Sequence, residues 1–217
     1  MPAAVTDAIA AGGTPEGTLP TGDALRLLRA WASLRGSDVL AADLTLTADC
    51  GPLVLRDTVQ YDRRTVNGQD FSCVRQGGLT LYFSGDKLCD AEGCALTVGD
   101  HATEQSQLVE LAYQLVLSGN AACTRSDKSD VYTLTLDEAG AADFAAAIAP
   151  DIQSQHASLT GGEVVLEVRN GYLRSIRVTC MGTVRVAMLE ADASLGAEIT
   201  FVQRNYPFPQ KVLTALQ

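Results

Sequence analysis

The sequence predicts an α+β fold, in which one large curved antiparallel sheet has its concave face covered by helices. Apolar residues recur at helical spacing in a few separated segments, and most of the remaining chain alternates apolar and polar residues with period two. The alternating segments follow one another through short turns, which is typical of antiparallel pairing and not of βαβ units. The predicted order is helix, strands, helix, strand, helix, strands and a short helix.

The first periodic segment predicts a helix over residues 23–35. One stripe of this helix is apolar and comprises Ala24, Leu27, Leu28, Trp31 and Leu34. Trp31 is the only tryptophan of the chain. Its position on the apolar stripe favours a role as a core anchor over a role in stacking on a ligand.

Two long strands and a series of short ones follow this helix. Residues 39–50 alternate strictly, with an apolar face formed by Leu40, Ala42, Leu44, Leu46, Ala48 and Cys50. After the Gly51-Pro52 turn, residues 53–66 continue the alternation with Leu53, Leu55, Val59 and Tyr61 on one face. Asn67-Gly68 is a strong hairpin signal. Short strands are predicted over 71–75, 79–84, 87–90 and 94–98.

The middle of the chain returns to helical spacing twice. A second helix is expected from Thr103 to Gly119, with Leu108, Leu111, Ala112 and Leu115 as its buried stripe. A strand over 130–136 comes next. Asp137 is the expected cap of a third, alanine-rich helix in which Phe144, Ala145 and Ile148 share a face, and Pro150 is expected to stop it.

The last third predicts a four-strand meander over 163–169, 172–180, 183–191 and 197–203. Its turns are expected at Asn170-Gly171 and Met181-Gly182. Val212, Leu213 and Leu216 then indicate a short amphipathic helix. Since no linker interrupts residues 23–217, this range is predicted to form a single domain.

Residues 1–22 are small and rich in Gly, Pro and Thr, which indicates a flexible leader or tether. They lack the basic start and apolar core of a signal peptide. Two interpretations remain open: a cytosolic protein, or an exported protein whose signal peptide has been removed. The leader composition and the six cysteines favour the second, and therefore a secreted or cell-envelope anchored protein.

Composition excludes several classes of protein. The chain has 217 residues, 47% of them hydrophobic, and a formal net charge of −10. The apolar fraction is normal for a folded chain, and the acidic excess argues against a nucleic-acid binder. No apolar run approaches the length of a membrane span. A monomer is expected.

The six cysteines contain one pair with a local geometric argument for a disulfide. A four-residue loop between Cys89 and Cys94 would close a hairpin and bring their Cβ atoms to disulfide distance. The alternative is two small buried apolar side chains. Zinc is disfavoured because this pair is the only close one and His101 fits no knuckle spacing. No metal and no cofactor are expected.

Catalytic motifs are absent from the sequence. His101 and His156 are the only histidines, Ser84 lacks the Gly-x-Ser-x-Gly elbow, and no phosphate-binding loop occurs. The sequence therefore predicts a protein that is not an enzyme. A helix-covered sheet either packs fully or leaves an apolar pocket. The candidate pocket residues are Trp31, Leu44, Leu46, Tyr61, Leu111, Leu115 and Phe144.

The layout resembles LolA/LppX-like envelope lipoproteins and lipoprotein carriers. The resemblance is carried by the first helix with the strand 38–47, by the meander 164–178, and by the ending Ile199-Thr200-Phe201, Tyr206-Pro207-Phe208-Pro209 and Leu216. It implies an unclosed half-barrel with helices in its mouth, an envelope location and an apolar ligand. The six cysteines and the absence of a visible signal or lipid-attachment cysteine depart from the pattern. No functional residue is transferred.

Three hypotheses follow. The first is a secreted or cell-surface protein that binds a lipid or another apolar molecule between sheet and helices. The second is a structural or protein-interaction module of the cell envelope with a packed core, whose partner would be an envelope protein. The third and least favoured is an enzyme that uses Cys94 or His101.

Overall fold

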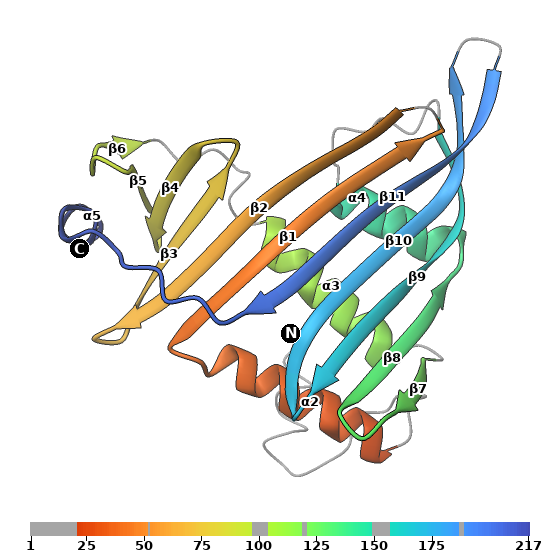
Figure 1. The fold of residues 1–217 in the computed structure, drawn as a ribbon, viewed down its shortest axis with the longest axis horizontal. Coiled ribbons are helices and arrows are strands. Elements are labelled where there is room, and N and C mark those ends of the chain that lie inside the picture. The colour runs from red at the N-terminus through yellow and green to blue at the C-terminus, as the bar shows by residue number, and fades with distance from the viewer. Residues whose placement is uncertain (1–20, 52, 97–103, 119–120, 149–156, 187–188) are drawn as a thin grey trace.

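The computed structural model describes residues 21–51, 53–96, 104–118, 121–148, 157–186 and 189–217. These residues form one sheet of eleven strands in the order β6-β5-β4-β3-β2-β1-β11-β10-β9-β8-β7. Neighbouring strands run antiparallel throughout. The first strand pairs with the last, so two meanders join at β1 and β11, and the sheet remains open at β6 and β7 (Figure 1).

The strands are β1 (Val39–Cys50), β2 (Leu53–Val66), β3 (Gln69–Gln76), β4 (Leu79–Ser84), β5 (Lys87–Asp90), β6 (Ala95–Leu96), β7 (Ala122–Arg125), β8 (Ser129–Leu136), β9 (Ala157–Arg169), β10 (Tyr172–Val186) and β11 (Leu189–Val202). The helices are α2 (Thr21–Arg35), α3 (Glu104–Ser118), α4 (Glu138–Ile148) and α5 (Gln210–Leu216). This arrangement confirms the predicted fold class, an open antiparallel sheet with helices packed on it.

One face of the sheet, here called the inner face, carries the main core. Leu44 of β1 lies opposite Val59 of β2 and Ile199 of β11, and all three are buried. α2 packs against β10, whereas α3 and α4 pack against β8 to β10 on the same side. In Figure 1 α3 and α4 lie behind the sheet. The period-two alternation of β1 and β2 therefore specified the buried face correctly.

The opposite, outer face carries a second and smaller core. Phe71, Cys73, Tyr82 and Cys89 of β3 to β5 are buried there beneath α5, which contributes Val212 and Leu216. The chain leaves β11, crosses the outer face and ends in α5 at β4 and β5 (Figure 1). The C-terminal segment thus covers the part of the sheet that lies farthest from α4.

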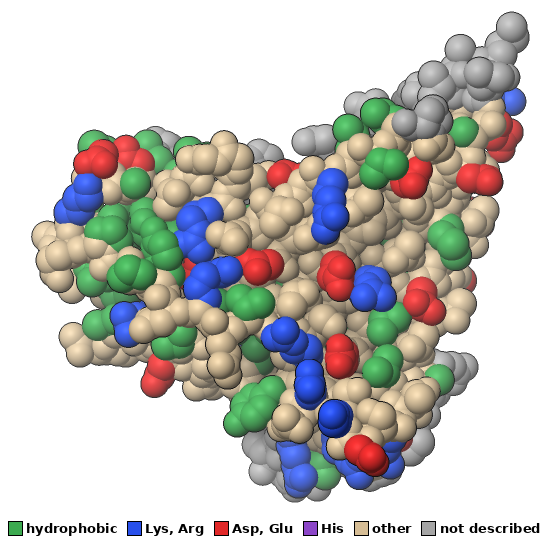
Figure 2. All heavy atoms as spheres, in the orientation of Figure 1, with side chains coloured by type: hydrophobic (Ala, Val, Ile, Leu, Met, Phe, Trp, Pro, Cys, Tyr) green, Lys and Arg blue, Asp and Glu red, His purple; other side chains and the backbone are tan. Residues whose placement is uncertain are grey.

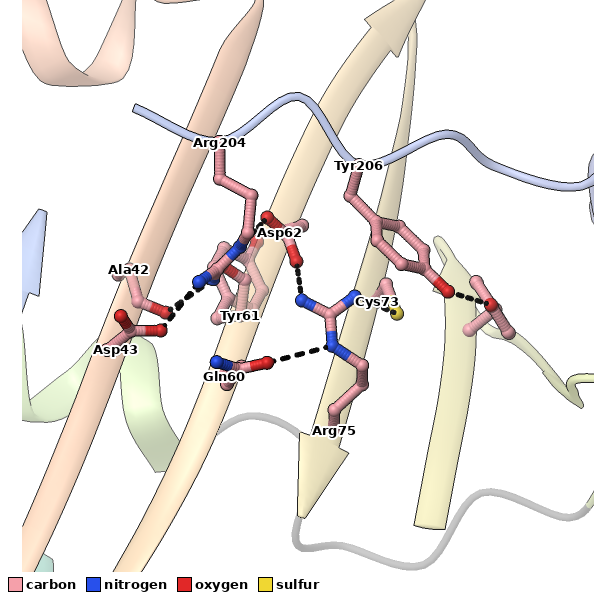
Figure 3. A network of polar contacts seen from close by, with 10 residues as sticks. Ala42, Asp43, Gln60, Tyr61, Asp62, Cys73, Arg75, Arg204 and Tyr206 are labelled. Atoms are coloured by element: carbon pink, nitrogen blue, oxygen red, sulfur yellow. Dashed lines mark hydrogen bonds and ion pairs between the residues drawn. The ribbon is translucent and has the colours of Figure 1, made fainter. Parts of the chain in front are cut away.

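A polar network fastens this C-terminal segment to the sheet (Figure 3). Arg204 donates from Nε to Asp62 Oδ1 at 2.8 Å and from Nη1 to Asp43 Oδ1 at 2.7 Å. Arg75 donates to the second oxygen of Asp62 at 2.5 Å, and its guanidinium lies 4.1 Å from the ring centroid of Tyr206. The hydroxyls of Tyr206 and Tyr82 are 2.8 Å apart. Asp62 is therefore a buried carboxylate held between two arginines.

The last meander differs from its prediction. The expected turn at Met181-Gly182 is wrong, because β10 continues to Val186 and pairs with β11 through the whole region. Gly182 lies inside the strand, where a Cβ atom would meet Ser158 O at 2.2 Å. The glycine permits close approach of β9 beside a register shift and does not form a turn. The region has three long strands instead of four.

Other local predictions had mixed outcomes. Asp137 caps α4 as predicted, since its Oδ1 accepts from the Gly140 backbone N–H at 2.8 Å. The structure adds β7, and it begins β9 at Ala157, six residues earlier than predicted. The leader up to residue 20, Thr103, Gly119, Pro150 and both histidines lie outside the described residues.

Candidate functional site: the inner face of the sheet

The seven candidate pocket residues lie on the inner-face side of the sheet, but they differ in exposure. Trp31, Leu44 and Phe144 are buried within the main core. Leu46, Leu111 and Leu115 are half-buried and pack against that core, and Tyr61 is half-buried beside Phe83 at 6.4 Å between ring centroids. The first three therefore lie within the packed core, and the other four lie at its border, where they are partly exposed.

The inner face stays apolar beyond this core, toward the turn between β1 and β2. Ala48 of β1 lies between Leu55 of β2 and Leu195 of β11, and Cys50 lies opposite Leu53. Leu53 and Leu55 are 55% and 57% exposed, whereas the other three are half-buried. We call the group Leu46, Ala48, Cys50, Leu53, Leu55 and Leu195 the apolar strip.

Polar contacts mark one side of the apolar strip. Asp57 lies opposite Leu46 on the inner face, and its carboxylate accepts a hydrogen bond from the Gln76 side chain. On the outer face the same strands are polar. Figure 2 shows acidic and basic side chains interspersed over β9 to β11, and Arg177 donates to Glu198 at 3.2 Å between β10 and β11. Exposed apolar side chains also occur on the outer face, as with Val54 of β2 and Met181 of β10, but there they are interspersed with charged residues.

Sequence reasoning identified the apolar faces of the strands but missed the apolar strip as a site. Leu53 and Leu55 fall on the apolar face that the alternation of residues 53–66 predicts. Which part of a strand the helices leave uncovered depends on where α3 and α4 pack, and this tertiary contact has no local signal in the sequence.

A second missed feature lies where α2 meets α3. The rings of Trp31 and Tyr113 pack with their centroids 4.5 Å apart and an interplanar angle of 30°. Burial raises the pKa of Tyr113 above its ordinary value, and the neighbouring backbone of Trp31 opposes this shift only in part. Neither Trp31 Nε1 nor Tyr113 Oη has a hydrogen-bond partner. The sequence placed Trp31 in the core but gave no sign of its contact with Tyr113.

The candidate disulfide is not formed in the structure, where Cys89 and Cys94 both carry free thiols. Cys89 is buried on the outer face, and its partner across the β5–β6 pair is Ala95 and not Cys94. The turn is held instead by the Asp90 carboxylate, which accepts from the backbone N–H groups of Glu92 and Cys94 at 2.9 Å each. Cys94 is exposed.

The buried thiols do not have the lowered pKa of a catalytic cysteine. Burial raises the pKa of Cys73 and of Cys180 to about 11, and burial also raises the pKa of Cys89. A nucleophilic cysteine needs the opposite shift, toward the thiolate. Within the part of the chain that the structure describes, no group of side chains could hold a metal ion, and no helix is long and apolar enough to cross a membrane.

Comparison with known proteins gives similarity in structure only. No family model and no curated protein match the chain. The crystal structure of the lipoprotein LppX of Mycobacterium tuberculosis matches at 11% identity over 85% of this chain and 96% of that chain, with a TM-score of 0.45. A DUF1329 family protein from Desulfovibrio piger matches at 11% identity over 89% and 98% of the two chains, with a TM-score of 0.35.

Proposed function

We propose that this chain is a non-enzymatic binding protein that holds a lipid or another apolar molecule on the inner face of its sheet. The apolar strip carries the proposal. It continues the main core on the same face, and Leu53 and Leu55 expose more than half of their surface there. Fully burying one leucine side chain stabilises by about 1.5–3 kcal/mol, so an acyl chain laid on the strip gains substantial free energy. A secreted or envelope-anchored location is part of the same proposal.

A second candidate function is a structural or protein-interaction module of the cell envelope. The burial of Trp31, Leu44 and Phe144 favours it, because these residues fill the interior where a pocket was expected. In this case the exposed leucines of the apolar strip contact a protein partner instead of a lipid. The two candidates differ in whether the purified protein binds a small apolar molecule by itself.

The strand β2 offers a matched pair of variants for the test. Leu55 and Val54 are adjacent and equally exposed, at 57% and 58%, but alternation puts Leu55 on the inner face and Val54 on the outer face. The experiment measures binding of the fluorescent apolar probe N-phenyl-1-naphthylamine to the wild type, Leu55→Asp and Val54→Asp. We expect the wild type to bind and Leu55→Asp to bind about tenfold more weakly, with Val54→Asp unchanged.

Urea unfolding of the three proteins serves as the folding control. Both side chains are exposed, so the three midpoints should agree closely. A wild type that binds no probe would overturn the proposal. Equal binding by the two variants would place any binding away from the apolar strip and would also contradict the proposal.

A second experiment is native mass spectrometry of the freshly purified protein before and after solvent extraction. A bound lipid should appear as an added mass that extraction removes.

A further inference from the structure

Two buried polar side chains in the main core make no hydrogen bond. Among the described residues, four buried side-chain atoms make no hydrogen bond: Asp23 Oδ1, Trp31 Nε1, Arg63 Nε and Tyr113 Oη. The Asp23 carboxylate is ion-paired with Arg125, and Arg63 donates from Nη2 to Ser37 O at 2.9 Å. Trp31 and Tyr113 have only one polar side-chain atom each, and neither atom makes a hydrogen bond, although the Trp31 backbone lies near enough to the Tyr113 hydroxyl to oppose the rise of its pKa.

The two aromatic rings that carry these atoms lie close together. Trp31 is 6% and Tyr113 is 3% exposed, and their rings are in contact between α2 and α3. A buried donor without an acceptor destabilises the folded state, whereas phenylalanine at either position would supply the apolar contact without that cost. The indole N–H can only donate, and the phenol remains protonated because burial raises the pKa of Tyr113. The site is therefore a pair of neutral donors that lacks an acceptor.

These donors belong to the same core as the proposed ligand surface. Leu111 and Leu115 of α3 are half-buried and pack against the core cluster that contains Trp31, Tyr113 and Leu44. Leu46 and Leu195 of the apolar strip pack against the same cluster. The exposed strip and the two donors thus border one core.

We propose that Trp31 Nε1 and Tyr113 Oη bind an oxygen acceptor of the ligand, and that the ligand is an amphiphile with a carboxylate or ester carbonyl whose apolar chain extends along the inner face. This inference rests on the proposed function and specifies its ligand class. The competing occupant is an ordered water molecule, which can also accept from both donors.

The test compares two probes that differ in the acceptor group. Oleate and 9-octadecene, each supplied from cyclodextrin, compete with N-phenyl-1-naphthylamine for the wild type, Trp31→Phe, Tyr113→Phe and the control Tyr132→Phe. Tyr132 is buried in the same core, but its hydroxyl already donates to Asp23 O at 3.2 Å. We expect Trp31→Phe and Tyr113→Phe each to weaken oleate binding about tenfold, with 9-octadecene unchanged and Tyr132→Phe like the wild type for both probes.

The outcomes separate the two proposals. If the wild type binds neither oleate nor 9-octadecene, the proposed function itself fails. If the wild type binds both, and Trp31→Phe and Tyr113→Phe bind oleate as tightly as it does, the proposed function stands and the donor pair holds water instead.

A second measurement needs no variant, because Trp31 is the only tryptophan. Its fluorescence is quenched at short range by stearate that carries a nitroxide at carbon 5 or at carbon 16. An acceptor held at Trp31 brings carbon 5 much closer than carbon 16, so we expect stronger quenching by 5-doxylstearate. Equal quenching, or stronger quenching by 16-doxylstearate, would contradict the inference.

Discussion

Arg204 and Asp62 form an ion pair with 2.8 Å between Nε and Oδ1, although 142 residues separate them in the chain. The Asp62 side chain is only 4% exposed, and its other oxygen accepts from Arg75. Arg204 also reaches Asp43 on β1. This pair joins the start of the C-terminal segment to the middle of the sheet and so holds the outer-face core closed.

Replacing Arg204 with alanine should destabilise the protein by about 2–3 kcal/mol, somewhat below the usual cost of breaking a buried pair because Arg75 still contacts Asp62. The guanidinium of Arg204 is also partly exposed. The measurement is urea unfolding at neutral pH. Asp62→Ala should cost at least as much, since it leaves two arginines without their shared carboxylate.

Arg177→Ala is the matched control for this prediction. Arg177 also pairs with a carboxylate across neighbouring strands, at 3.2 Å from Glu198, but both side chains are exposed. An exposed pair contributes about 0.2–1 kcal/mol. Equal losses for Arg204→Ala and Arg177→Ala would show that the C-terminal segment does not depend on its buried pair.

The sequence predicted local structure better than contacts between distant segments. Alternation placed Leu44, Val59 and Ile199 in strands, and the first two on the correct apolar face, because period-two burial is encoded within each strand. The pairing of β1 with β11 is not encoded within either strand, and neither is the position of Arg204 between Asp43 and Asp62. From the sequence alone an arginine in a loop is expected to be solvated, and only the tertiary fold shows that a buried carboxylate lies beside this one.

The candidate site shows the same limit. Four of the seven predicted pocket residues border the core, whereas Trp31, Leu44 and Phe144 are packed inside it. An apolar stripe gives the direction in which side chains point but not how completely a second layer covers them. The turn prediction at Gly182 failed for a related reason, since this glycine allows close approach of two strands and does not form a turn.

Gly162→Ala should destabilise the sheet by about 1–3 kcal/mol, because its Cβ would lie 2.2 Å from Thr179 O and the backbone of β9 or β10 must move. Gly196→Ala is the control. Gly196 is also inside a long strand, yet the nearest atom to its Cβ would be 3.6 Å away. Urea unfolding should place Gly196→Ala at or above the wild type, and similar losses for both variants would contradict the close approach.

Stability should fall as the pH rises from about 9 to about 11. Burial raises the pKa of the Cys73 and Cys180 thiols to about 11 from the ordinary value of 9.0. In this window the unfolded chain has lost both protons while the folded protein keeps them, so the unfolded state binds fewer protons and the free energy of unfolding decreases with pH.

The variant that isolates this effect is Cys73→Ala/Cys180→Ala. It is expected to be less stable at pH 7, because two buried side chains are truncated, but its stability should decline less steeply than the wild type above pH 9. Denaturant unfolding at several pH values between 7 and 11 gives both slopes. Parallel slopes would show that the thiols do not titrate differently in the folded and unfolded states.

Alkylation of the native protein should modify Cys94 first. Cys94 is exposed, whereas Cys73, Cys89 and Cys180 are buried. Burial keeps the Cys89 thiol protonated by raising its pKa, and an inaccessible neutral thiol reacts slowly.

The measurement is iodoacetamide treatment at pH 8 without reductant, followed by mass mapping of the alkylated peptides. A bridge between Cys89 and Cys94, as the hairpin spacing predicts, would instead leave both unmodified until a reductant is added and would lower the intact mass by two hydrogens. The free thiols and the Asp90-capped turn favour rapid labelling of Cys94 with no such mass difference.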